Sequence, residues 1–142
     1  MKTVAQILKL KPSGVISIRS DVPVLDALKL LADKDVGAVL VMDGSRLVGI
    51  VSERDYARKV ELKGRSSRDT PVSAIMTPEV VCVTPTQTNE ECMALMTEKR
   101  ARHLPVIDNG RVVGVLSIGD LVKDAISEQQ FIIEQLEHYI HR

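Results

Sequence analysis

Two short motifs in the sequence combine a hydroxyl group with a carboxylate at the same spacing. They are Ser52-x-x-Asp55 and Ser117-x-x-Asp120, and each follows a run typical of a strand and precedes a run typical of a helix. A serine at such a junction can cap the helix, and an acid three residues later lies at the positive end of the helix dipole. The same helix start can bind a phosphate through its unpaired N–H groups, and a carboxylate beside it can accept the paired hydroxyls of a ribose. Helix capping and nucleoside-phosphate binding are therefore both open interpretations.

Basic side chains near each motif could bind phosphate oxygens. Arg102 and His103 precede a predicted strand close to the second motif, and arginine can hold a phosphate through a bidentate fork. The first copy has Gly37 and Ala38 at the equivalent place and offers Arg54 inside its own motif. We expect two pockets that are not equivalent, unless Arg102 and His103 are ordinary surface residues at the start of a strand.

Each motif closes one copy of a repeated unit. The segment from Val15 to Glu61 returns as Val80 to Ile126, and each copy predicts the order strand, helix, strand, strand, helix. Below roughly 70–80 residues a single core rarely gives adequate stability, so the copies should pack together. The sequence therefore predicts an α+β fold of two repeats with pseudo-twofold symmetry, a ligand cleft between them and a long C-terminal helix.

The expected boundaries follow from this repeat. We predict a first repeat with its lead-in helix at residues 1–64, a polar linker at 65–71, a second repeat at 72–127 and a C-terminal helical extension at 128–142. Each repeat should keep its own lead-in segment, the first one capped by Thr3. Within the copies we expect first strands at 15–18 and 81–83, a capping box at Thr88-x-x-Glu91, and hairpin turns at Asp43-Gly44-Ser45 and Asp108-Asn109-Gly110.

The composition argues against several partners. Lys and Arg number 19 and Asp and Glu also number 19, so the charge excess expected of a nucleic-acid-binding protein is missing. With one Phe, two Tyr and no Trp, the chain also lacks aromatic platforms for bases. There is neither an apolar run of the roughly 18 residues that span a membrane nor a signal-peptide core at the start. We therefore expect a cytoplasmic protein that binds neither nucleic acid nor membrane.

The remaining candidate groups suggest no chemistry of their own. Cys82 and Cys92 are interpreted as buried structural thiols, with a thiol sensor as the alternative. His138 and His141 lack further ligands of the kind that a metal needs, so no metal is predicted. Without a catalytic triad order, a Walker loop or a dinucleotide-type glycine motif, we expect no enzyme.

An apolar stripe in the last helix suggests a protein partner. Its residues are too many for the second copy to cover alone, and an exposed stripe usually meets a partner. The stripe comprises Phe131, Ile132, Leu136, Tyr139 and Ile140.

The combined pattern resembles tandem cystathionine-β-synthase (CBS) domains, also called a Bateman module. The resemblance rests on Gly-h-h-Ser-x-x-Asp at the end of each unit, where h is an apolar residue, and on the run Arg102-His103-Leu104-Pro105. It covers the chain from Val4 to about Ile126, and the whole chain resembles stand-alone, bacterial-type CBS-pair proteins. It implies a non-catalytic sensor that binds an adenine nucleotide between its repeats, forms a homodimer and acts on an unidentified effector protein. AMP is the expected ligand and ATP, ADP or NAD(H) the alternatives, with no metal required; the alternative function is a ligand-free interaction and dimerisation module.

The resemblance also implies roles for single residues. Asp55 and Asp120 would hold the ribose hydroxyls, and Ser52 and Ser117 would help to bind phosphate. Arg102 and His103 match a phosphate-binding position. The base would lie among strand residues and backbone groups, namely Ile16, Gly37 and Ala38 facing Val115 and Ser117, and Val81 and Arg102 facing Ile50 and Ser52.

Overall fold

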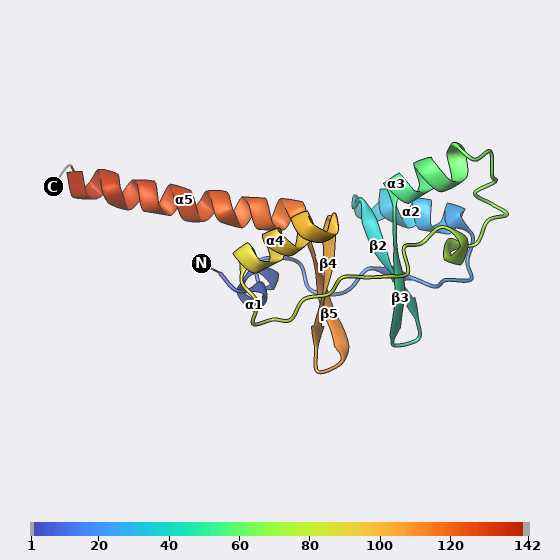
Figure 1. Cartoon of the computed structure of the whole chain (residues 1–142), viewed down its shortest axis with the longest axis horizontal. Coiled ribbons are helices and arrows are strands. Elements are labelled where there is room, and N and C mark those ends of the chain that lie inside the picture. Colours follow the sequence, from blue (N-terminus) through green and yellow to red (C-terminus); the bar gives the residue numbers. More distant parts are fainter. Residues whose placement is uncertain (1, 141–142) are drawn as a thin grey trace. The chain divides into compact units, whose positions relative to one another are not determined.

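The computed structural model describes residues 2–140 and divides the chain into two compact units (Figure 1). The first-repeat unit is Val15–Val80. The second-repeat unit joins the segment up to Gly14 with the chain from Val81 onward. Each unit combines an antiparallel hairpin with helices, which confirms the predicted α+β class.

The first-repeat unit is built on a three-stranded sheet. Its strand β1 pairs in parallel with β2, which pairs antiparallel with β3. Helix α2 covers the sheet because Val24, Ala27 and Leu31 recur at helical spacing and are buried against the alternating valines of β2 and β3. Its elements are β1 (Ser17–Ile18), α2 (Val24–Lys34), β2 (Ala38–Asp43), β3 (Arg46–Ser52), α3 (Glu53–Tyr56), the π-helical turn η1 (Ala57–Glu61) and the 3-10 turn η2 (Val72–Ala74).

The second-repeat unit repeats the hairpin and helices. Thr3 and Thr88 cap α1 and α4, as predicted, and Thr88 forms the predicted capping box; the cap at Thr3 is also a capping box. The last helix extends far beyond the other elements of its unit (Figure 1). The elements are α1 (Val4–Leu8), α4 (Asn89–Lys99), β4 (His103–Asp108), β5 (Arg111–Ser117) and α5 (Ile118–Ile140).

Both hairpins close on residues with left-handed backbone, as the turn sequences predict. Gly44 has φ +65°, and in the second hairpin Asn109 and Gly110 have φ +52° and +76°. Glycine and asparagine tolerate this region better than other residues do.

The strand predicted at 81–83 does not form. Val83 makes an isolated parallel bridge to Val106, whereas the first copy has a two-residue strand at this place. The reason is Pro105, which stands where the first copy has Leu40. The Leu40 N–H donates to the carbonyl of Ile16 at 3.3 Å, and proline has no N–H for the equivalent bond.

The same segment corrects the prediction for Cys82. Val83 turns into the core with 1% of its surface exposed, so its neighbour Cys82 points outward and is exposed. Cys92 is buried in the core of the second-repeat unit, as predicted.

The lead-in segments pack differently from the expectation. Val4 and Ile7 of α1 lie in the core of the second-repeat unit, while Val72 and Ile75 near η2 lie in the core of the first-repeat unit. Backbone bonds fix the first of these placements, because the Val4 N–H donates to the Gln87 carbonyl at 2.8 Å. Each lead-in therefore completes the core of the other copy, and the sequence boundaries of the repeats differ from those of the compact units.

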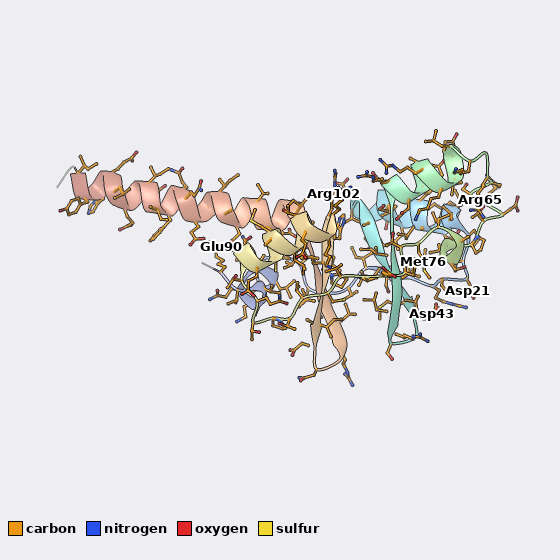
Figure 2. The ribbon with its side chains drawn as sticks, viewed as in Figure 1. Asp21, Asp43, Arg65, Met76, Glu90 and Arg102 are labelled. Carbon is orange, nitrogen blue, oxygen red and sulfur yellow. The ribbon has the colours of Figure 1, made fainter. Side chains whose placement is uncertain are left out.

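Gly49 marks a close approach within the first-repeat unit. A Cβ at this position would lie 2.7 Å from the sulfur of Met76 and 3.0 Å from the Thr77 carbonyl oxygen (Figure 2 labels Met76). Thr77 cannot move freely, because it exchanges hydrogen bonds of 3.0 and 2.8 Å with Ile50.

We expect Gly49→Ala to lower the free energy of unfolding by about 1–3 kcal/mol through overpacking. Gly37→Ala is the matched control, because nothing lies within 4 Å of a Cβ there. Urea denaturation of both variants measures their free energies of unfolding. An equal loss of stability in the two variants would contradict the prediction.

Candidate functional site

The Ser117 motif joins the end of β5 to the start of α5. The Ser117 N–H donates to Asp120 Oδ2 at 2.8 Å, and the Asp120 N–H donates to Ser117 Oγ at 3.2 Å. These reciprocal bonds confirm the capping interpretation. The carboxylate lies at the positive end of a helix of 23 residues.

Lys11 lies directly against this motif. Its Nζ donates at 2.7 Å both to Asp120 Oδ2 and to the carbonyl of Val115. The lysine and aspartate side chains are 31% and 23% exposed, so the pair is partly shielded from water. The sequence analysis did not identify Lys11 as a neighbour of the motif. The one signal in the sequence is that a lysine stands here where the second copy has the apolar Met76.

The Asp120 carboxylate is held ionised by its neighbours. Burial by itself raises its pKa, but the hydrogen bonds from Lys11 and from the Ser117 N–H outweigh burial and lower the pKa below the ordinary value. The carboxylate is therefore an acceptor at neutral pH.

The neighbouring His103 is kept uncharged at neutral pH. It begins β4 and pairs in register with Ser117 of β5. Burial lowers its pKa, the charges of Lys11 and Arg102 lower it further, and Asp120 offsets this in part. His103 is therefore a neutral imidazole, which can donate one hydrogen bond and accept one.

Arg102 is exposed at the start of β4 (Figure 2). Its carbonyl accepts from the Ile118 N–H at 2.9 Å, which ties the start of α5 to the beginning of the hairpin. In the first copy the Gly37 carbonyl accepts from the Glu53 N–H at 3.1 Å in the same way. The backbone around the two motifs is thus alike, although the side chains differ.

The Ser52 motif has the same cap and a different lysine. The Ser52 N–H and Oγ donate to Asp55 Oδ2 at 2.9 and 3.0 Å, and the Asp55 N–H donates back to Ser52 Oγ at 3.1 Å. Lys59, one turn further along, lies with its Nζ 3.0 Å from Asp55 Oδ1. The same Nζ donates to the Ile75 carbonyl at 2.9 Å.

The structure divides the predicted residues between the two units, each of which also holds the motif of its own copy. Ala38 pairs with Ser52 in register, and the Ile16 carbonyl accepts from the next strand. The predicted facing of base-binding residues from one copy to the motif of the other stays a prediction. The first-repeat unit holds Ile16, Gly37, Ala38, Ile50, Ser52, Arg54 and Asp55, and the second-repeat unit holds Val81, Arg102, His103, Val115, Ser117 and Asp120.

Within residues 2–140, no group of three or more His, Cys, Asp and Glu side chains could hold a metal ion. His141, considered together with His138, lies outside the described residues. In the same part of the chain, no helix is both long and apolar enough to cross a membrane.

The family model of the CBS domain matches residues 7–62 and 72–126. The chain therefore belongs to the CBS domain family and carries two copies of the domain, which confirms the resemblance.

Three comparisons place the chain within that family. The solved structure of a protein with CBS domains from Burkholderia ambifaria MC40-6 is 55% identical, has a TM-score of 0.87 and is covered over 96% of its length by 90% of this chain. The mitochondrial CBS domain-containing protein CBSX3 of Arabidopsis thaliana is 40% identical over 126 residues, 85% of this chain, which spans 61% of the plant protein. The CBS domain-containing protein YhcV of Bacillus subtilis (strain 168) is 30% identical over 115 residues, and the match spans 81% of both chains.

We expect Lys11→Met to lower the free energy of unfolding by about 1 kcal/mol at pH 7, the scale of a partly exposed ion pair. The lowered pKa of Asp120 means that this contribution is present above the unfolded-state pKa of about 3.9 and is lost as the pH falls through the folded-state pKa. Urea denaturation should therefore show a larger difference from wild type at pH 7 than at pH 3.

The matched control is Lys9→Met, which removes an exposed lysine from the same segment. A loss that persists unchanged at pH 3 would show that packing of the Lys11 stem, and not its charge, is responsible.

Proposed function

We propose that this protein is a non-catalytic regulatory module that binds an adenine nucleotide, with AMP as the first candidate and ATP, ADP and NAD(H) as alternatives. The observation that supports this most is the ionised Asp120 carboxylate, fixed at the start of a long helix with Lys11 bonded to it and His103 nearby. That combination offers acceptors for a diol and donors for an anion within one site.

The residues of the second-repeat unit suggest how such a ligand would be held. The Asp120 carboxylate would accept the ribose hydroxyls, as acidic residues do in dinucleotide folds. The N–H groups at the start of α5 and the Arg102 guanidinium would bind phosphate oxygens. Val115 is half-buried and would contact the base without an aromatic ring.

Regulation would follow from a difference in affinity. A ligand can shift an equilibrium between two arrangements of the chain by no more than its differential affinity for them. We propose that nucleotide binding changes how the module engages an effector protein.

The direct test of this proposal is calorimetric titration of the nucleotide-stripped protein with AMP, ATP, NAD and NADH. Asp120→Asn should weaken binding at least tenfold while changing the melting temperature by only a few degrees, because asparagine can still accept the Ser117 N–H and keep the cap. Asp108→Asn, at an exposed position in the second hairpin, is the matched control.

Two results would count against nucleotide binding. One is the absence of heat with all four compounds from a folded protein. The other is an Asp120→Asn variant that loses stability and binding in parallel, which would reduce the motif to a helix cap.

A second candidate function is an interaction module, and the exposed face of α5 favours it. Several of its large apolar side chains are half exposed or more. They are Ile126, Phe131, Ile132, Leu136, Tyr139 and Ile140, with exposed fractions of 62%, 61%, 50%, 57%, 71% and 74%.

If α5 mediates self-association, a chain ending at Ser127 should become monomeric and still bind AMP. The segment removed contributes no buried residue to the described core, so the unit should stay folded. Sedimentation of the full and truncated chains measures their oligomeric states, and AMP titration is the control for folding. A truncated chain that keeps the wild-type oligomeric state would rule out α5 as the interface.

A further inference from the structure

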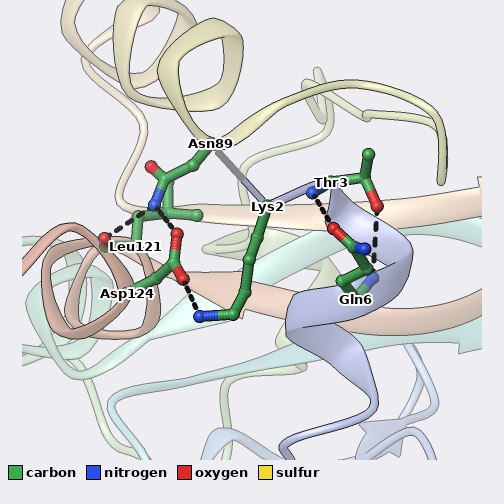
Figure 3. Close-up of polar contacts among 6 residues, drawn as sticks. All are labelled: Lys2, Thr3, Gln6, Asn89, Leu121 and Asp124. Carbon is green, nitrogen blue, oxygen red and sulfur yellow. Dashed lines mark hydrogen bonds and ion pairs between the residues drawn. The ribbon is translucent and has the colours of Figure 1, made fainter. Parts of the chain in front are cut away.

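The first turns of α5 use one side of the helix to pack on their own unit. Leu121 and Asp124 are the buried residues of this helix. Asn89 Nδ2 donates to the Leu121 carbonyl at 2.9 Å and to Asp124 Oδ2 at 2.6 Å (Figure 3). Lys2 Nζ donates to Asp124 Oδ1 at 2.8 Å, whereas every residue from 129 to 140 is exposed. In the part of the chain that the structure describes, α5 is therefore held at its base and no other segment covers its outer part.

A second side of α5 carries apolar side chains at heptad spacing. The intervals between them alternate between four and three residues, the spacing that keeps one seam facing a partner helix in a coiled coil. Gln129 is the one polar residue on this seam, which spans roughly 27 Å along the helix axis. The seam consists of Val122, Ile126, Gln129, Ile133, Leu136 and Ile140.

Phe131 lies on the opposite side of α5 from the seam. At about 3.6 residues per turn, a residue two positions from Ile133 points away from it. Phe131 instead lines a hollow together with Lys2, Ser127 and Glu128. It is 61% exposed and Ile133 is 47% exposed. The two residues thus differ mainly in their side of the helix, and Phe131 can serve as a control for the seam.

The charges and side-chain sizes of α5 favour a second copy of the same helix running in the opposite direction. Between Ile118 and Ile140 there are five acidic residues and a single lysine, Lys123. In an antiparallel pair centred on residue 131, Lys123 lies beside Glu137 of the partner subunit, and symmetry repeats this contact. On the other flank of the seam, the small Ala125 lies beside the partner subunit's Tyr139. Opposite charges and complementary sizes therefore meet on the two flanks.

A parallel pair of helices would be less favourable. It would place Ile132 beside Glu137 of the partner subunit and leave Lys123 without an acid. It would also bring Glu134 and Glu137 of both helices together, at the negative ends of the two helix dipoles. Its one advantage is that Gln129 would face its own copy. In the antiparallel pair the two Gln129 side chains still lie only about one helical turn apart at the symmetry axis, where their amides can bond.

We infer that α5 pairs with α5 of a second copy of this chain as an antiparallel coiled coil. This inference rests on the second candidate function, association through α5, and adds the partner, the direction and the register. The seam residues meet in three kinds of layer: Val122, Ile126 and Gln129 face the partner subunit's Ile140, Leu136 and Ile133.

The direction is tested by reversing charges in the full chain and measuring the dissociation constant by sedimentation equilibrium. Lys123→Glu and Glu137→Lys should each raise it by about fivefold at low salt, because like charges then meet twice in every pair. The double variant restores opposite charges and should return to within twofold of wild type. In a parallel pair the two positions do not meet, so the double variant would show no recovery.

Glu137→Lys is the more demanding of the two single variants. It makes an acidic helix less negative, so general repulsion between helices predicts tighter association. The antiparallel contact with Lys123 predicts weaker association instead. Tighter association of Glu137→Lys would therefore overturn the inferred register.

The seam is tested by Ile133→Glu, which places a charge at the centre of the pair. The dissociation constant should rise at least tenfold, because an unpaired charge would be buried there. Phe131→Glu is the matched control, because it adds the same charge to the opposite side of the same helix. It should keep the wild-type association, and equal effects of the two substitutions would overturn the seam. Both residues are exposed in the unit, so the melting temperatures should stay close to that of wild type.

The chain that ends at Ser127 separates this inference from the function on which it rests. If that chain keeps the wild-type oligomeric state, association through α5 itself is overturned. If the truncation dissociates the assembly but the charge-exchanged double variant does not recover, the antiparallel register is overturned and the interaction function stands. A wild type that is monomeric at every concentration would overturn pairing between copies.

Discussion

The fold and the candidate site depend on one interaction, the reciprocal bonding of serine and aspartate where a strand becomes a helix. In each copy it fixes the direction in which the helix leaves the sheet. A backbone bond from the first helical residue to the start of the preceding hairpin supports it, from Ile118 to Arg102 and from Glu53 to Gly37. Because the serine N–H binds only one carboxylate oxygen, capping and ligand binding are compatible. The same aspartate can serve both.

The two motifs have similar backbones but different charged neighbours. Lys11 bonds the Asp120 oxygen that is already engaged in the cap. Burial and, after it, the charge of Lys11 lower the pKa of His103, which leaves a neutral imidazole beside an ionised acid. Lys59 lies 3.0 Å from the remaining oxygen of Asp55. The two copies thus share one backbone architecture, while a different lysine in each sets the electrostatic environment of its aspartate.

Features set by neighbouring residues could be predicted from the sequence, and features set by distant ones could not. The hairpins, the boxes at Thr3 and Thr88 and the two motif caps depend on local spacing, and all appear. The exchange of lead-in segments was missed because both are short apolar stretches that either core could accept. The lysine partners were missed because pairing depends on tertiary contacts. The loss of the strand at 81–83 was foreseeable, since Pro105 stands at a position that must donate.

The exchange of lead-in segments has a consequence for the order of events during synthesis. The first-repeat unit is continuous from Val15 to Val80, so all residues of its core are present once that segment has left the ribosome. The preceding segment, with Val4 and Ile7, has no core to join until the chain after Val81 has been made. At about 5–20 residues per second this delay is on the order of ten seconds. The segment with Val4 and Ile7 therefore emerges before the first-repeat unit but packs after it, and until then its apolar side chains are available to chaperones.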